Sequence, residues 1–216
     1  MRNFITYEWF TIFSMVSLLA IAMAKYSNLL RFADFMAVLG NSKYLKIYSK
    51  EQKFIDRFDG FLFVNLALSM SIFLFYTYSV FVSQLTFELV PFLKLILAVA
   101  TIMLIKTLLE RLIGSLFEID SIIDRYVFQK TTFKNYTGFV FLVANLLLLY
   151  TSGYHKIIIV ITICVVFLIN MVGFLTSFKS YQKTINLNLF YFLLYLCALE
   201  IAPYVLLYKA ITDYNT

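Results

Sequence analysis

Six apolar stretches, each close to the length that crosses a lipid bilayer, constrain this chain more than any other feature of its sequence. An α-helix needs roughly 20 predominantly apolar residues to span the hydrocarbon core. The approximate bounds of the stretches are Tyr7–Tyr26, Gly60–Ser83, Pro91–Leu112, Tyr136–Ser152, Ile157–Phe178 and Leu189–Ile211. This pattern predicts an all-α, polytopic membrane helix bundle with about six transmembrane helices and short amphipathic cytoplasmic helices.

Composition favours a single integral membrane domain over residues 1–216. Of the 216 residues, 62% are hydrophobic and 14% are charged, whereas soluble domains carry about 25% charged residues. Six glycines and two prolines leave no stretch that resembles a linker. Cys164 and Cys197 lie inside apolar stretches without a metal-binding spacing, so we expect no disulfide framework, metal site or cofactor.

Basic residues predict the orientation of the helices. Lys and Arg tend to stay on the cytoplasmic side, and most of the 18 in this chain follow the first, third and fifth stretches. Both termini are therefore expected to face away from the cytoplasm. The sequence Ala22-Met23-Ala24 also resembles a signal-peptidase site, but a weakly basic start and the charge of Glu8 favour a first helix that is retained.

A run of basic residues at helical spacing follows the first apolar stretch. Its members are Lys43, Lys46, Lys50, Lys53 and Arg57. Steps of three and four residues would place all of them on one face of a helix, where they could bind anionic lipid head groups or an acidic partner. The general excess of cytoplasmic basic residues explains the same pattern without a function. A capping box at Ser49 and Gln52 would restart the helix and break the run.

The next cytoplasmic segment, Phe117–Lys130, is acidic. Glu118, Asp120 and Asp124 could hold a divalent cation through their carboxylates. No histidine or glycine-bearing loop accompanies them, so pairing with the basic run is favoured. The two segments are predicted to form one compact cytoplasmic cap.

Charged residues inside the apolar stretches mark a candidate intramembrane polar site at Glu200, Lys106, Glu110 and Pro203. Lys106 and Glu110 lie one helical turn apart and can pair locally. At 1.5 Å per residue, Glu200 lies ~16 Å and Lys106 ~9 Å from the same side, so an interhelical pair between them is geometrically allowed. An unpaired carboxylate at mid-bilayer costs about 2.5–3.5 kcal/mol, so Glu200 is expected to have a partner or a water-filled cavity. Pro203 frees the carbonyl of Leu199 at the same level.

Two uses of Glu200 stay open. It could be a buried latch that fixes the arrangement of the helices, or the titrating group of a proton- or ion-coupled carrier; the latch is favoured because nothing else resembles a substrate path. Asn65, Asn145 and Asn170 lie within apolar stretches and are expected to hydrogen-bond to other helices. The chain has no phosphate loop, nucleophile elbow or HExxH motif, so catalytic residues are not expected.

The last apolar stretch also carries a family resemblance. The sequence NLFYFLLYLCALEIAPYVLLYKAI, Asn188–Ile211, resembles the C-terminal signature of an uncharacterised family of multi-pass membrane proteins from Bacteroidota, domain of unknown function 4271. The segments NSKYLKIYSKEQ and FDGFLFVNLALS resemble the same family, so the likeness covers most of the chain. The resemblance implies an inner-membrane location in a bacterium with two membranes, but no activity or ligand.

Together these patterns favour a non-enzymatic inner-membrane subunit or assembly factor of a cell-envelope complex. The expected partners are the lipid bilayer, with anionic lipids at the cytoplasmic face, and another membrane protein; nothing indicates nucleic acid. The alternative is a small proton- or ion-coupled membrane transporter that uses Glu200. Many carriers contain internal repeats, and no convincing repeat is visible in this chain.

Overall fold

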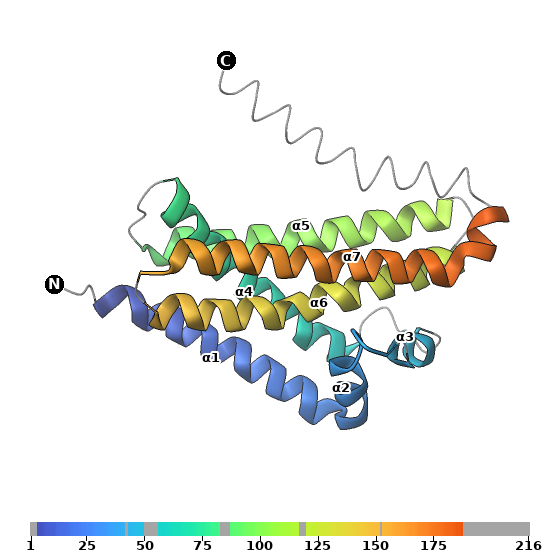
Figure 1. The fold of residues 1–216 in the computed structure, drawn as a ribbon, viewed down its shortest axis with the longest axis horizontal. Helices are drawn as coiled ribbons and strands as arrows, with labels where there is room; N and C mark the ends of the chain where they lie inside the picture. The colour runs from blue at the N-terminus through green and yellow to red at the C-terminus, as the bar shows by residue number, and fades with distance from the viewer. Residues whose placement is uncertain are drawn as a thin grey trace, which may run out of the picture.

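The computed structural model describes residues 4–41, 43–49, 56–82, 87–116, 120–151 and 153–187. These residues form seven helices and no strand, which confirms the all-α prediction. The helices are α1 (Phe4–Ser27), α2 (Leu29–Met36), α3 (Lys43–Tyr48), α4 (Arg57–Phe81), α5 (Leu89–Leu116), α6 (Asp120–Tyr150) and α7 (His155–Leu187). The long helices run roughly along the longest axis of the molecule, and α2 and α3 lie together below the right-hand half of α6 (Figure 1).

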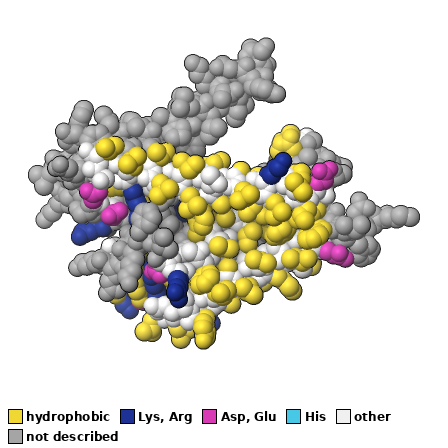
Figure 2. All heavy atoms as spheres, turned by 180° about the vertical axis from the view of Figure 1, so that it is seen from behind, with side chains coloured by type: hydrophobic (Ala, Val, Ile, Leu, Met, Phe, Trp, Pro, Cys, Tyr) yellow, Lys and Arg dark blue, Asp and Glu magenta, His cyan; other side chains and the backbone are white. Residues whose placement is uncertain are grey.

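In the described part of the chain, five helices are long and apolar enough to cross a membrane. The candidate spans are Glu8–Ser27, Arg57–Phe81, Leu89–Leu116, Ile123–Tyr150 and His155–Thr176. They correspond to the first five predicted stretches, and the sixth, Leu189–Ile211, lies outside the described residues. Figure 2 shows apolar side chains over the middle of one face of the molecule, with charged side chains towards its edges.

The fourth span begins earlier than the sequence analysis predicted. α6 runs without a break from Asp120 to Tyr150, so residues 120–130 of the acidic segment continue into the apolar stretch as one helix. The polar residues that delayed the predicted start are buried against neighbouring helices; they include Thr132, which is 2% exposed, and Asn135, which is 1% exposed. A hydropathy pattern treats such residues as if they faced lipid, and it therefore ends the span too soon.

α4 and α6 form the centre of the bundle. More than half of their span residues are buried, whereas most of those of α5 and α7 are exposed. The close approach of α6 to α4 depends on Gly138, because a Cβ there would lie 2.7 Å from Nδ2 of Asn65 and 3.1 Å from the Cα of Leu66. In the same way, a Cβ on Gly173 of α7 would lie 2.7 Å from the ring of Phe133 on α6. Small residues at such crossings let membrane helices pack closely.

A buried amide also joins the two central helices. Nδ2 of Asn145 on α6 donates a hydrogen bond to the Ser69 carbonyl on α4 at 2.7 Å, so the prediction of an interhelical bond is confirmed for Asn145. For the other two amides it is wrong. Oδ1 of Asn65 accepts from the Ser69 hydroxyl at 3.3 Å and Nδ2 of Asn170 donates to the Val166 carbonyl at 2.8 Å, each within its own helix. Groups one turn away on the same helix are the nearest partners there.

Replacing Asn145 with leucine is expected to lower the free energy of unfolding by about 0.6 kcal/mol, and by no more than about 1.7 kcal/mol, the range for hydrogen bonds between membrane helices. The Ser69 carbonyl belongs to the backbone of α4, so it keeps a helical hydrogen-bond partner. Equilibrium unfolding in mixed micelles measures the change. Asn170→Leu is the matched control, because Asn170 is exposed and bonded within α7; equal losses in the two variants would contradict the interhelical role.

Candidate functional site

Charged and aromatic side chains converge where α2, α3 and the first turn of α4 meet; we call these three elements the cap. α2 begins after Asn28, whose extended backbone and side chain form its N-cap: Oδ1 accepts the Arg31 backbone N–H at 3.0 Å. Arg31 and Phe35 lie four residues apart on α2 and therefore share one face. That face packs inward, since Phe35 is fully buried and the Arg31 side chain is 11% exposed.

The Arg31 guanidinium connects α2 to both other elements of the cap. Nη2 donates to Oδ2 of Asp59 at 2.9 Å, and Nη1 donates to Asp56. Nε donates to the Tyr44 hydroxyl of α3 at 3.4 Å. Asp56 is itself the N-cap of α4, because its Oδ1 accepts the Phe58 backbone N–H at 3.2 Å. One side chain thus holds the start of α4 against α2 and α3.

Aromatic rings enclose this charge. The Arg31 guanidinium carbon lies 4.6 Å from the centre of the Phe58 ring and 5.1 Å from that of Tyr48. Cation–π contacts of this kind contribute most where water is excluded. Tyr44 in turn stacks on Phe128 of α6, with ring centres 5.8 Å apart. The cap is therefore packed onto the central helix as well as onto α4.

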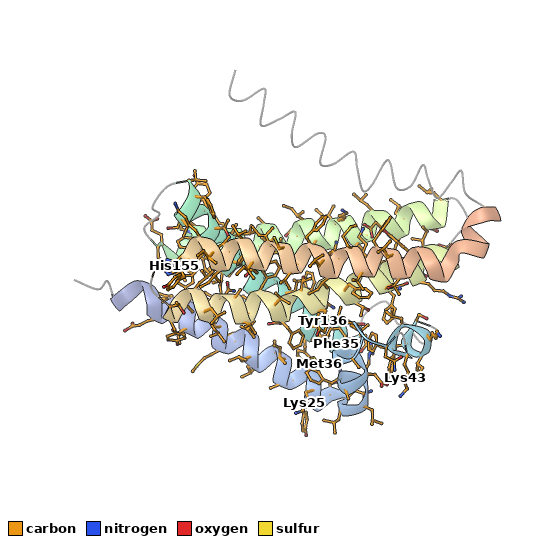
Figure 3. The ribbon with its side chains drawn as sticks, in the orientation of Figure 1. Lys25, Phe35, Met36, Lys43, Tyr136 and His155 are labelled. Atoms are coloured by element: carbon orange, nitrogen blue, oxygen red, sulfur yellow. The ribbon has the colours of Figure 1, made fainter. Side chains whose placement is uncertain are left out.

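Figure 3 shows the second contact between the cap and α6, where Phe35 of α2 and Tyr136 approach each other. Their ring centres are 5.9 Å apart, and Phe35 also packs edge-on against Tyr44 at 5.6 Å. Lys43, labelled in the same view, lies farther out on α3. The inner side of the cap is thus aromatic, and its basic residues lie towards the outside.

The Arg31 guanidinium and the Tyr44 hydroxyl keep their protonation states over a wide pH range. Burial lowers the pKa of the Arg31 guanidinium, but the oxygen atoms of Tyr44, Asp59 and Asp56 outweigh that effect and raise the pKa above its ordinary value. Burial, reinforced by Asp59, raises the pKa of the Tyr44 hydroxyl. Arg31 therefore stays protonated and Tyr44 stays neutral at any physiological pH.

The sequence analysis did not select Arg31 as a site residue. Asp34, the acidic residue nearest to Arg31 in the sequence, accepts instead from Lys43 Nζ at 3.2 Å. A signal was available in the sequence DRFD, where Asp56 and Asp59 lie three residues apart at the start of an apolar helix and thus share a face. Two carboxylates at that position indicate a cationic partner from another segment.

The predicted basic run does not occupy one helix. Lys43 and Lys46 lie on α3, which ends at Tyr48, while Arg57 is the first residue of α4. The expectation of a single basic face is therefore wrong, because the extended backbone of Asp56 starts a separate helix. Lys50 and Lys53 lie outside the described residues. Lys43, Lys46 and Arg57 are exposed.

The acidic segment contacts α5. Asp124 of α6 lies 3.7 Å from Nε of Arg111 on α5. Pairing of this segment with the basic run stays a prediction, because Lys50 and Lys53 lie outside the described residues. Glu118 lies outside the described residues, and Asp120 begins α6. Within the described ranges, no three His, Cys, Asp or Glu side chains gather closely enough to hold a metal ion.

The intramembrane site is partly described. Glu110 of α5 is 2% exposed, and its Oε1 accepts from Lys130 Nζ of α6 at 2.5 Å. The sequence analysis did not consider Lys130 as a partner because it assigned that residue to a separate cytoplasmic segment. Lys106 lies on α5, one turn before Glu110, and Glu200 and Pro203 lie outside the described residues. A pair between Glu200 and Lys106 stays a prediction.

A pocket of about 510 Å³ lies among α4, α5, α6 and α7. Most of its lining is apolar, with aromatic rings from Phe73, Phe141 and Phe167. Lys134 and Asn170 supply polar groups from α6 and α7. The pocket therefore combines a mostly apolar wall with a few polar side chains.

The five apolar helices among the described residues, together with the apolar outer faces of the bundle, indicate an α-helical membrane protein. The family model described as Domain of unknown function (DUF4271) matches residues 10–211. The chain belongs to this family, as the resemblance of its last stretch indicated. It matches no curated protein and no solved structure.

Proposed function

We propose that this protein is a non-enzymatic, multi-pass subunit or assembly factor of a cell-envelope complex in the inner membrane, with both termini periplasmic. Its cap lies on the cytoplasmic side and binds a partner membrane protein there, beside anionic lipid head groups. The observation that carries the proposal is the set of contacts that Arg31 makes with Tyr44, Asp56 and Asp59. These contacts hold α2 and α3 in one arrangement against α4, and a fixed surface is what recognition of a partner requires.

The outer surface of the cap supports a binding role. Leu29, Leu30 and Met36 of α2, a short amphipathic helix, are 63%, 77% and 41% exposed. Lys43 and Lys46 lie close by in the chain on α3 and are exposed. A surface with apolar side chains next to basic ones can bind at the boundary between lipid head groups and acyl chains. The basic side chains can also bind an acidic surface of a partner protein at that level.

The experiment is a purification of the tagged protein from its native membrane in mild detergent, followed by mass spectrometry of the proteins that accompany it. Lys46→Glu reverses a charge on the cap, and Lys156→Glu makes the same change at an exposed position near the start of α7. We expect a defined set of envelope proteins to accompany the wild type and Lys156→Glu. With Lys46→Glu, the amount of these proteins should fall at least tenfold, which corresponds to a loss of about 1.4 kcal/mol in binding free energy. Purification of the wild type alone would contradict the proposal.

The same preparations test the transporter alternative. If the protein is a proton- or ion-coupled carrier, liposomes that contain the wild type should take up protons or solute. Liposomes that contain Glu200→Gln should not, because glutamine cannot release a proton. The subunit proposal predicts no uptake in either case. Uptake that depends on Glu200, together with a protein that purifies alone, would replace the proposed function with the alternative.

A further inference from the structure

α2 packs beside the membrane-spanning part of α6 rather than beyond its end. Apolar side chains such as Leu147 remain exposed up to the turn after α6, and the exposed Tyr150 is of a residue type that is common at membrane interfaces, so one boundary of the hydrocarbon core lies close to Tyr150. Phe35 of α2 packs against Tyr136 and Phe139 of α6, with ring centres 5.9 Å apart in both cases. At 1.5 Å per residue, these two residues lie ~21 Å and ~16 Å from Tyr150, and the core is ~30 Å thick. The inner face of α2 is therefore level with the core.

α7 gives the same depth independently. Leu175 is exposed and lies ~30 Å along α7 from His155, so the apolar surface of the bundle continues to that level. Gly173 comes just before Leu175, and a Cβ on Gly173 would lie 2.7 Å from the ring of Phe133 on α6. Tyr136 follows Phe133 along α6, so the contacts of α2 lie nearer to the middle of the membrane than Phe133 does. Figure 1 agrees, because α7 continues to the right beyond α2.

The outer face of α2 is apolar throughout. Leu29, Leu30, Ala33 and Met36 are exposed, and their spacing places them on one side of the helix. Phe35 on the opposite side is fully buried. A surface helix that borders water carries polar or charged residues on its outer face. The outer face of α2 has the composition of a surface that borders lipid chains.

Both charged residues of α2 have partners of opposite charge. Arg31 donates to Oδ2 of Asp59 at 2.9 Å, and Asp34 accepts from Lys43 Nζ at 3.2 Å. Asp59 lies ~33 Å along α4 from Phe81, so Arg31 reaches its partner near the edge of the core. Ionisable side chains at membrane depth pair with each other or extend to the interface in this way. The charges of α2 are therefore compatible with a helix that lies among lipid chains.

α3 lies at a different level from α2. Tyr44 of α3 stacks on Phe128, with ring centres 5.8 Å apart. Phe128 lies ~33 Å along α6 from Tyr150, which is at the far boundary of the hydrocarbon core. Lys43 and Lys46 are exposed on α3. They are thus at the level of the lipid head groups, where lysine side chains bind anionic lipids.

We propose that α2 is embedded in the acyl-chain layer of the leaflet on the cap side, where Leu29, Leu30 and Met36 contact lipid tails, while α3 lies among the head groups. The partner of the outer face of α2 is thus the bilayer itself. This inference goes beyond the proposed function, because it depends on the depth of α2 and not on the binding of a protein to the cap.

Tryptophan quenching tests the depth of α2. Trp9, the one tryptophan of the chain, is replaced by phenylalanine, and Leu30→Trp places a single fluorophore on the outer face of α2. The purified protein is reconstituted in phosphatidylcholine nanodiscs with one copy per disc. Phosphatidylcholine that is brominated on its acyl chains quenches tryptophan among the chains, whereas iodide quenches tryptophan that contacts water. We expect the brominated lipid to remove more than half of the fluorescence of Leu30→Trp, and iodide to remove less than a tenth.

Two control positions calibrate the measurement. Leu19→Trp lies at an exposed position in the α1 span and should resemble Leu30→Trp. Lys46→Trp lies at an exposed position on α3 and should be quenched mainly by iodide. Met36→Trp repeats the measurement at a second position on the outer face of α2.

The proposal is overturned if Leu30→Trp and Met36→Trp are quenched by iodide and not by the brominated lipid, because α2 would then border water. It is also overturned if neither quencher acts, because protein would then cover this face. The protein in the nanodiscs is purified without partners. The result is therefore independent of whether envelope proteins accompany the chain from its native membrane, and the failure of one proposal is distinguishable from the failure of the other.

Discussion

Replacing Gly138 with leucine is expected to leave little monodisperse protein in mild detergent. A Cβ alone at this position would lie 2.7 Å from Nδ2 of Asn65 and 3.1 Å from the Cα of Leu66. Asn65 is fully buried, and the Leu66 contact is with backbone, so neither can move aside without separating α4 from α6. Overpacking commonly costs about 1–3 kcal/mol. Leucine adds a whole side chain at the centre of the bundle, so we expect a loss at or above ~3 kcal/mol.

Gly60→Leu is the matched control for this substitution. Gly60 also lies in α4, but a Cβ at Gly60 would meet no atom within 4 Å. Glycine within a helix is less favourable than alanine by about 0.8–1 kcal/mol, and leucine is close to alanine, so this variant should melt at or above the wild-type temperature. Size-exclusion chromatography and thermal denaturation followed by circular dichroism compare the two variants. Similar melting temperatures would show that α4 and α6 are not packed closely at Gly138.

Replacing Arg31 with leucine is expected to detach the cap from the bundle. The substitution leaves two carboxylates, Asp56 and Asp59, without the cation that contacts both. Loss of one partner from a fully buried ion pair costs about 3–5 kcal/mol, chiefly because the remaining charge is uncompensated. Asp56 and Asp59 are 30% and 25% exposed, so we expect a smaller loss here. The spans of the bundle have their own packing, so we expect local opening of α2 and α3. Limited proteolysis should then cleave residues 28–56 much faster than in the wild type.

Two further variants separate the charge effect from a general loss of packing. Arg31→Leu combined with Asp56→Asn and Asp59→Asn removes the stranded charges, and asparagine is as good an N-cap as aspartate, so protection should partly return. Lys43→Ala removes a pair whose lysine side chain is 58% exposed, and such a pair contributes at most about 1 kcal/mol. Equal proteolysis of Arg31→Leu and Lys43→Ala would contradict the central role of Arg31.

Sequence patterns predicted the helices well and their polar contacts poorly. Five predicted apolar stretches correspond to spans in the structure because bilayer thickness imposes a local length requirement. The start of α6 was misjudged because burial inside a bundle makes residues such as Asn135 acceptable within a span. The consequence was that Lys130 was not considered as the partner of Glu110.

By itself, the amino-acid sequence determined the fold class, the approximate positions of the five long helices that the structure describes, and the family. These depend on the composition of continuous segments, since each membrane helix satisfies its own backbone hydrogen bonds. The tertiary structure alone decided which charges pair: Arg31 bonds to Asp56 and Asp59 in place of its neighbour Asp34, and Glu110 bonds to Lys130. The physical reason is that an ion pair requires two side chains to meet within a few ångströms, and their meeting depends on how helices pack at their ends and crossings.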